Sequence, residues 1–273
     1  MKIQVLLVVI IAVIGIGCQK EKSAEELSNK FATCKNEYIG GCKLTKIVYE
    51  PISSTGTQQV VDLTYTGNQI TLVKDPNDQR KIIYNADGKI SSIEYTEKRS
   101  SFLYAIEKMT YNSLKQLTSI LVLYNVGNSL FDSLYRTDYQ YSLTNQLTRK
   151  AYFDYDSQAK AWKTSENYLY TYDNLGLVTL VNYTNPSANP PTYPISVNYT
   201  DSCNSFQKVY PQLELLDYIG QEDLGGFSVL LNSKKLVSSF LNQNVTYSFN
   251  SKNAPTEIRI NGLLRVSYIY TCP

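Results

Sequence analysis

Hydrophobic and polar positions alternate along most of the chain, and few stretches show helical periodicity. The run Tyr168-x-Tyr170-x-Tyr172 is typical, because side chains alternate between the two faces of a strand and all three rings therefore share one face. Short polar segments rich in Asn, Asp and Gly separate these runs and favour tight reversals. The pattern predicts an all-β fold, an antiparallel meander of hairpin repeats with about a dozen strands in one long curved or barrel-like sheet.

One unit recurs from about Leu44 onward. An aromatic anchor is followed by a polar or Gly-containing turn such as Asn85-Ala86-Asp87-Gly88, and apolar residues lie six and nine positions after the anchor. Successive anchors from Tyr84 to Tyr172 are 27, 30 and 31 residues apart, the length of one hairpin and its return. The anchors are Tyr84, Tyr111, Tyr141 (with Lys150 at the ninth position), Tyr172 and Phe249, and Tyr65 begins a shortened copy whose turn is Gly67-Asn68.

The repeat lapses between Cys203 and Asn242. Within this stretch, Leu213–Ile219 has apolar residues at i, i+3 and i+6, which fits a short helix. We expect a helical or loop insert near 208–232 that packs against one end or the open edge of the sheet, since exposed edges need covering. The chain thus divides into a leader over 1–17, a tether over 18–42 and one β-repeat domain over 43–273, irregular at about 203–242.

The first residues predict export. Lys2 precedes Val5–Gly17, an apolar run of 13 residues, whereas a membrane-spanning helix needs about 20. The run ends in small residues before Cys18 and resembles a bacterial lipobox, with Gly15 where Leu is usual. The resemblance implies cleavage before Cys18 and acylation of this cysteine, hence a lipid anchor; the alternative is an ordinary secretory signal. Gln19, rather than Asp, favours the outer membrane.

Export places the remaining cysteines in an oxidising compartment. With the first cysteine assigned to lipid, four remain, and they allow three connectivities. They lack CxxC spacing and a histidine partner, which argues against a zinc site. Proximity favours a disulfide between Cys34 and Cys42. Cys203 and Cys272 then form the second, since each follows a similar strand end.

Composition argues against several classes of protein. The chain has 26 Lys+Arg and 24 Asp+Glu, so there is no basic excess to bind nucleic acid. It has no histidine, the commonest general base and zinc ligand, and no GxxxxGK[ST], GxSxG or HExxH motif. We expect no enzyme, cofactor or metal, and Asp87 is interpreted as a turn former. A carboxylate-dependent glycoside hydrolase is the minor alternative. Its candidate carboxylates are Glu94, Asp154, Asp156, Glu166 and Asp173.

Aromatic residues are the best candidates for binding. Tyrosine accounts for 24 of 273 residues, and Trp162, the single tryptophan, lies in a polar stretch between tyrosine-rich runs. Exposed rings suit sugar stacking or partner contacts. We expect a binding face there; the alternative is that the tyrosines only pack across strands and Trp162 folds back on its loop. The candidate residues are Tyr152, Tyr155, Trp162, Tyr168 and Tyr170.

The Tyr-Asp/Asn-x-x-Gly-x-hydrophobic units resemble degenerate YD repeats of the Rhs type. With the lipobox, Tyr247-x-Phe249-Asn250 and the terminal Tyr268-x-Tyr270-Thr271-Cys272, the layout is similar to uncharacterised lipoproteins of Bacteroidota with a porin-like or barrel-like β fold. The resemblance covers about residues 43–273. It implies an architecture and an envelope location, and no activity.

Two functions follow as expectations. The first is a lipid-anchored, non-catalytic binding module for a glycan or another envelope ligand, held by exposed aromatic rings. The second is a structural or accessory envelope protein whose partner is another protein. Contiguous exposed rings flanked by Asp, Asn or Lys favour the first, whereas buried rings and a bare strand edge favour the second.

Overall fold

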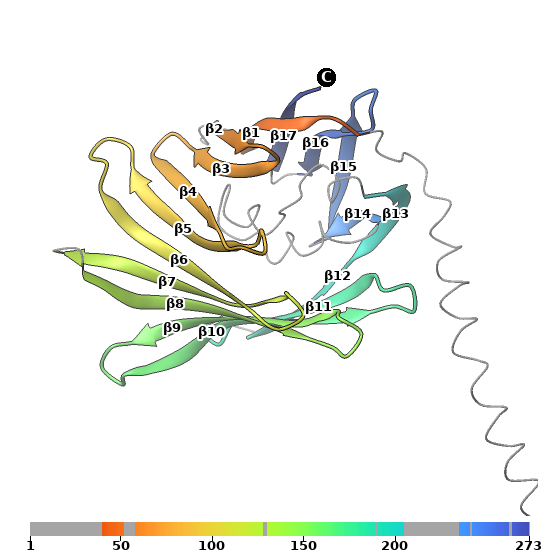
Figure 1. Cartoon of the computed structure of the whole chain (residues 1–273). Helices are drawn as coiled ribbons and strands as arrows, with labels where there is room; N and C mark the ends of the chain where they lie inside the picture. Colours follow the sequence, from red (N-terminus) through yellow and green to blue (C-terminus); the bar gives the residue numbers. More distant parts are fainter. Residues whose placement is uncertain are drawn as a thin grey trace, which may run out of the picture. The chain divides into compact units, whose positions relative to one another are not determined.

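The computed structural model describes residues 40–51, 58–127, 130–188, 191–204, 235–240, 242–261 and 264–272, all within the compact unit of residues 37–273. These residues form seventeen antiparallel strands in a nearly closed, barrel-like sheet, which confirms the predicted fold class (Figure 1). No membrane-spanning helix is present among them. The leader with Cys18, the tether with Cys34 and the insert near 208–232 lie outside the described residues.

The strands follow one another around the sheet in chain order. Each pairs with the next, and β12 and β13 are two parts of one strand that breaks at Val197. The strands outnumber the expected dozen because β12 to β14 form where the sequence shows no clear copy of the repeat. The bounds are β1 (Lys43–Pro51), β2 (Gln59–Thr66), β3 (Gln69–Lys74), β4 (Asp78–Tyr84), β5 (Ile90–Glu97), β6 (Leu103–Tyr111), β7 (Leu117–Gly127), β8 (Leu130–Tyr141), β9 (Leu147–Asp156), β10 (Ala161–Tyr172), β11 (Val178–Thr184), β12 (Thr192–Ser196), β13 (Asn198–Cys203), β14 (Lys235–Phe240), β15 (Gln243–Phe249), β16 (Pro255–Ile260) and β17 (Leu264–Thr271).

Five hairpins share one turn conformation. In the turn after Tyr84, the side-chain oxygen of Asn85 accepts the backbone N–H groups of Asp87 and Lys89. Gly88 donates its N–H to the Asn85 carbonyl at 3.0 Å and has a φ of 73°, in the left-handed region. An accepting side-chain oxygen at the first position and a left-handed residue at the fourth recur in four further turns. These turns begin at Asn112, Ser142, Asp173 and Asn250.

A tyrosine hydroxyl ties each repeat to the one before it. Tyr84 on β4 donates its hydroxyl to the carbonyl of Ile70 on β3 at 2.7 Å. After the turn, Ser91 forms a bulge and donates its hydroxyl to the Ile83 carbonyl at 3.1 Å. Both contacts give a buried or half-buried polar group a backbone partner, which holds the hairpins in register. The matching tyrosines are Tyr111, Tyr141 and Tyr172, and the matching bulge residues are Thr118, Thr148 and Thr179.

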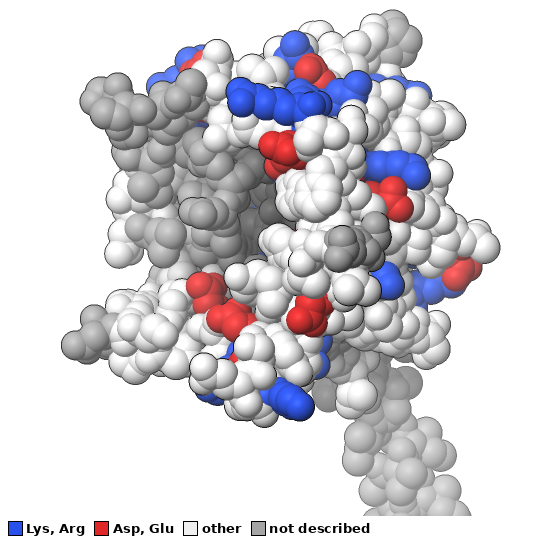
Figure 2. Space-filling model, turned by 90° about the vertical axis from the view of Figure 1, so that its left-hand side faces the viewer, with Lys and Arg blue, Asp and Glu red and all other residues white. Residues whose placement is uncertain are grey.

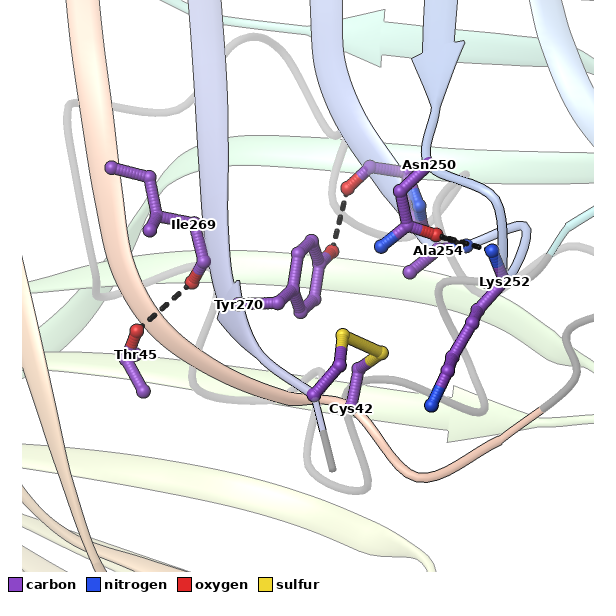
Figure 3. Close-up of a disulfide and its surroundings, with 9 residues drawn as sticks. Cys42, Thr45, Asn250, Lys252, Ala254, Ile269 and Tyr270 are labelled. Atoms are coloured by element: carbon purple, nitrogen blue, oxygen red, sulfur yellow. Dashed lines mark hydrogen bonds between the residues drawn. A yellow bond between two sulfur atoms is a disulfide. The ribbon is translucent and has the colours of Figure 1, made fainter.

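The last unit is divided between the two ends of the chain. Tyr270 on β17 donates its hydroxyl to the Pro255 carbonyl at 2.6 Å, the tyrosine contact of the repeat. Tyr270 pairs with Leu44 on β1, and Thr45 forms the bulge and donates to the Ile269 carbonyl at 3.1 Å (Figure 3). Strands β17 and β1 therefore make one hairpin of the repeat whose turn is replaced by the chain ends.

A disulfide joins Cys42 to Cys272 where the other hairpins have their turn (Figure 3). Cys42 directly precedes β1, Cys272 directly follows β17, and their Cα atoms are 4.1 Å apart. Both expected pairings, Cys34 with Cys42 and Cys203 with Cys272, are therefore wrong. The pairing of the first and last strands outweighs proximity along the chain, because it fixes two residues 230 positions apart at bonding distance.

In the full copies of the repeat, the apolar side chains six and nine positions after the anchor are buried or half-buried on one face, called here the inner face. In the repeat of Tyr141, Lys150 takes the ninth position; it is buried, with its ammonium 4.9 Å from the centre of the Tyr152 ring. The alternation of the strand thus places the Lys150 side chain among the apolar side chains of the inner face. The buried apolar residues of these rows include Leu44, Ile47, Ile70, Val73, Ile90, Ile93, Leu117, Ile120, Val178, Val181 and Ile258.

Candidate functional site

The five aromatic residues expected to form one binding face lie on two faces of the sheet. Trp162 pairs with Tyr155 between β10 and β9, and their ring centres are 5.2 Å apart in an edge-on arrangement. A bulge in β10 shifts the alternation, so Tyr168 and Tyr170 belong to the inner face with Tyr152. Tyr168 and Tyr170 are buried in the core. They are not part of an exposed face, which corrects the expectation for these two residues.

The tryptophan lies in a packed cluster on the outer face. The Arg136 guanidinium is 5.1 Å from the centre of the Trp162 ring and 4.7 Å from that of Phe153, and it pairs with Asp138 at 3.1 Å. Cation–π contacts of this kind stabilise the rings and cover their faces. Trp162 is half-buried. The cluster therefore favours the interpretation in which this tryptophan packs against its own hairpin.

Two tyrosines on the inner face donate to carboxylates of nearby strands. Tyr95 on β5 donates to Glu107 on β6 at 2.9 Å, and Tyr104 on β6 donates to Asp78 on β4 at 2.9 Å. Burial, and then the charge of Glu107, raises the pKa of the Tyr95 hydroxyl. Burial and the hydrogen bond to Asp78 raise the pKa of Tyr104 in the same way. Both phenols therefore stay protonated near neutral pH and act as fixed donors.

A half-buried arginine completes this network. Arg80 pairs with Asp75 at 2.7 Å, and its guanidinium lies 5.5 Å from the centre of the Tyr95 ring. Its Nε and Nη1 atoms are buried without a hydrogen-bond partner. Neither composition nor motifs indicate that Arg80 and Glu107 lie on the inner face, but the alternation of apolar residues around them does. Each stands two residues from a buried apolar residue, Ile82 or Ala105, in an alternating run.

A more exposed group of side chains follows on the same face, near the β7–β8 hairpin. This rim patch consists of Tyr124, Asp132, Tyr135, Asp154 and Lys163. Tyr124 pairs with Asp132, Tyr135 with Asp154, and Asp154 with Lys163, so strands β7 to β10 place them side by side. The rings of Tyr124 and Tyr135 meet edge-on with centres 6.0 Å apart, and Tyr135 is 48% exposed.

The rim patch combines the two kinds of group that bind sugars. A tyrosine ring presents an apolar face to C–H groups, and carboxylates or an ammonium bond the hydroxyls. Asp132, Asp154 and Lys163 are exposed, and Lys163 also forms an ion pair with Asp156. Burial, followed by the effect of Tyr135, raises the pKa of Tyr124, which keeps this hydroxyl protonated. Figure 2 looks onto this end of the sheet and shows acidic side chains along its lower part.

The carboxylates considered for glycoside hydrolysis have separate structural contacts. Asp173 accepts two backbone N–H groups of its turn, and Glu94 pairs with a lysine on the neighbouring strand. Asp156 accepts two backbone N–H groups of its loop, and Glu166 accepts a tyrosine hydroxyl at 2.8 Å. Asp154 belongs to the rim patch. Across the described ranges, no three His, Cys, Asp or Glu side chains gather as metal ligands.

Comparison with known proteins gives structural likenesses alone. No protein-family model matches the sequence, and no curated protein does. A porin-like protein from Bacteroides vulgatus is similar over 84% of this chain and 98% of its own, with 16% identity and a TM-score of 0.46. A DUF3836 family protein from the same organism is similar over 33% of this chain and 97% of its own, with 15% identity and a TM-score of 0.27. At these values the likenesses carry no argument about function.

Proposed function

We propose that this protein is a non-catalytic binding module of the cell envelope that holds a glycan at the rim patch. The observation that carries the proposal is the placement of Tyr135. Its ring is 48% exposed, faces the edge of a second tyrosine and stands in register with Asp154. The other inner-face tyrosines that pack against the core are buried or half-buried, whereas the Tyr135 ring is exposed beside polar groups.

The closure of the sheet supports binding through side chains rather than through a strand edge. Strand β1 pairs with β2 on one side and with β17 on the other, so the two ends of the chain leave no bare edge where they meet. A partner protein that adds a strand needs such an edge. A ligand that stacks on Tyr135 and bonds Asp132 or Asp154 needs none.

The test is affinity electrophoresis of the detergent-solubilised full chain in gels that contain neutral polysaccharides. The proposal expects a concentration-dependent retardation that Tyr135→Ala and Asp154→Asn each reduce at least about tenfold, as the loss of a main contact at a small site does. Tyr155→Ala is the matched control, because it removes a half-buried tyrosine from the opposite face of the same sheet.

Three outcomes separate the sites. Retardation lost in Tyr135→Ala and kept in Tyr155→Ala supports the rim patch. Loss in Tyr155→Ala or Trp162→Ala alone moves the site to the outer cluster and overturns the proposal. Absence of retardation across the panel in a protein with an unchanged circular dichroism spectrum also overturns it and leaves the protein-partner function.

We also propose that Cys18 carries the lipid that keeps the domain at the membrane, as the lipobox resemblance implies. Cells expressing the chain and fed an alkyne-tagged fatty acid should yield labelled protein, and Cys18→Ala should abolish the label. Cys203→Ala is the control, since it removes another cysteine and leaves the leader intact. Equal labelling of the parent and Cys18→Ala would contradict the anchor.

A further inference from the structure

Three large apolar side chains are exposed at the tips of two neighbouring hairpins. Phe102 precedes β6 and is 48% exposed, Val126 near the end of β7 is 62% exposed, and Leu130 at the start of β8 is 65% exposed. We call these three residues the tip patch. Side chains of this size normally lie inside, and a group of them at one place marks an interaction site.

The strand pairing brings together the loops that carry the tip patch. The side-chain amide of Asn125 donates to the Leu103 carbonyl at 3.0 Å, which holds the end of β7 against the start of β6. Gly127 pairs with Leu130 across the β7–β8 hairpin. The three apolar residues therefore lie on adjoining loops at one end of the sheet.

Two cations accompany the tip patch. Lys98 and Arg99 are exposed in the β5–β6 loop that leads to Phe102, and neither forms an ion pair with any described residue. Exposed carboxylates also lie at this end, namely Glu97, which accepts the hydroxyl of Ser100, and Asp132 of the rim patch. An unpaired positive charge beside exposed apolar groups is complementary to a surface that is anionic outside and apolar beneath.

The opposite end of the sheet lacks this combination. Leu114 and Leu143 are exposed there, each alone in its own turn between different strands. The lysine that follows Leu114, Lys115, pairs with Asp87 at 2.8 Å. Among the described residues, exposed apolar side chains therefore occur at both ends of the sheet, but only the β5–β8 end combines them on adjoining loops with cations that form no ion pair.

We propose that the tip patch docks on an anionic lipid surface. Phe102, Val126 and Leu130 enter the boundary between headgroups and acyl chains, and Lys98 and Arg99 meet the lipid phosphates. Exposed apolar side chains on loops beside cations without ion pairs match the apolar and anionic layers of a lipid surface. The inference does not depend on glycan binding, because it uses none of the rim-patch residues.

The test uses the full chain reconstituted in phosphatidylglycerol vesicles whose acyl chains are brominated near the headgroup. In a Trp162→Phe background, Phe102→Trp places the single tryptophan in the tip patch. Leu143→Trp, in the same background, is the matched control, because Leu143 is a fully exposed leucine at the opposite end. Circular dichroism of each variant checks that the sheet is intact.

The proposal expects fluorescence of the Phe102→Trp variant to fall at least about twofold in brominated vesicles, with little change for Leu143→Trp. Adding Lys98→Glu and Arg99→Glu should restore most of the signal, and vesicles of phosphatidylcholine alone should quench less. Equal quenching of both probes, or no quenching of the tip probe while the protein stays with the vesicles, overturns the proposal. Quenching that is unchanged by the two Glu substitutions overturns the role of Lys98 and Arg99 in binding anionic lipid.

Discussion

Tyr270 and Leu44 face each other across β17 and β1 in the relation that Tyr84 and Ile90 have within a single hairpin. In both cases the tyrosine donates its hydroxyl to a carbonyl of the preceding strand. The residue that follows its cross-strand partner, Thr45 or Ser91, forms a bulge, after which the regular pairing resumes. The two ends of the chain therefore build one more hairpin of the repeat. Closure of the sheet depends on this long-range pairing, in which the disulfide takes the place of the turn.

Loss of the disulfide should destabilise the domain. Cys42→Ser, which leaves Cys272 unpaired, is expected to lower the free energy of unfolding by about 2–5 kcal/mol, because the bond closes a very long loop in the unfolded chain. Urea unfolding followed by circular dichroism measures the change. Reductant should lower the midpoint of the parent towards that of the variant. Equal midpoints for parent and variant under oxidising conditions would contradict the role of this bond.

The tyrosine hydroxyl contacts should contribute individually. Tyr84→Phe removes the donor to the Ile70 carbonyl and keeps the ring, so we expect a loss of about 0.5–1.5 kcal/mol in the free energy of unfolding. Tyr155→Phe is the control and should change it by less than about 0.5 kcal/mol, as an ordinary surface substitution does. If the two variants were equally stable, the hydroxyl contact would have no part in holding the repeats together.

Substitutions at the left-handed position of two turns should change the stability of the domain. Gly88→Ala is expected to destabilise by about 1 kcal/mol, because alanine avoids a φ of 73°. An added Cβ meets only the Gln69 side-chain nitrogen, at an ordinary 3.6 Å, so crowding does not contribute. Asn145→Gly, at the same position of another turn, should be neutral or slightly stabilising. Thermal unfolding should show a lower midpoint for Gly88→Ala and an equal or higher midpoint for Asn145→Gly.

Alkaline pH should weaken the fold through its tyrosines. Burial raises the pKa of Tyr172 from 10.0 to about 12. Below pH 10 both the folded and the unfolded states are protonated, and the contribution of this group to stability is fully present. Between pH 10 and 12 only the unfolded chain ionises, so stability falls as pH rises. The tyrosinate absorbance that the parent gains over a Tyr172→Phe variant should therefore appear in this range together with loss of circular dichroism; its appearance at pH 10 with the sheet intact would contradict the burial of Tyr172.

The repeat was visible in the sequence where local chemistry determines it. Asn85 and Gly88 provide an accepting side chain and a left-handed glycine, and the turn could be predicted from them alone. Lys115 and Asn253 adopt the same left-handed conformation without glycine, with φ of 60° and 57°. The sequence signal for these two turns was weaker, because the paired strands impose the left-handed conformation there and the residue itself does not favour it.

Features that depend on distant strands could not be read from the sequence. Proximity favoured Cys34 as the partner of Cys42, and only the pairing of β1 with β17 brings Cys272 there. The prediction of a single binding face was wrong for a related reason, since one bulge in β10 moves Tyr168 to the face opposite Trp162. Periodicity assigns residues to faces only as far as the next bulge.

The most direct test of glycan binding at the rim patch is a titration of the full chain, labelled with carbon-13 in its tyrosine rings, with the oligosaccharide of the best-retained polysaccharide. Signals are assigned with Tyr124→Phe, Tyr135→Phe and Tyr155→Phe. We expect saturable shifts of the Tyr135 and Tyr124 resonances and no shift of the Tyr155 resonance. Saturation with shifts at Tyr155 and none at Tyr135 would contradict it.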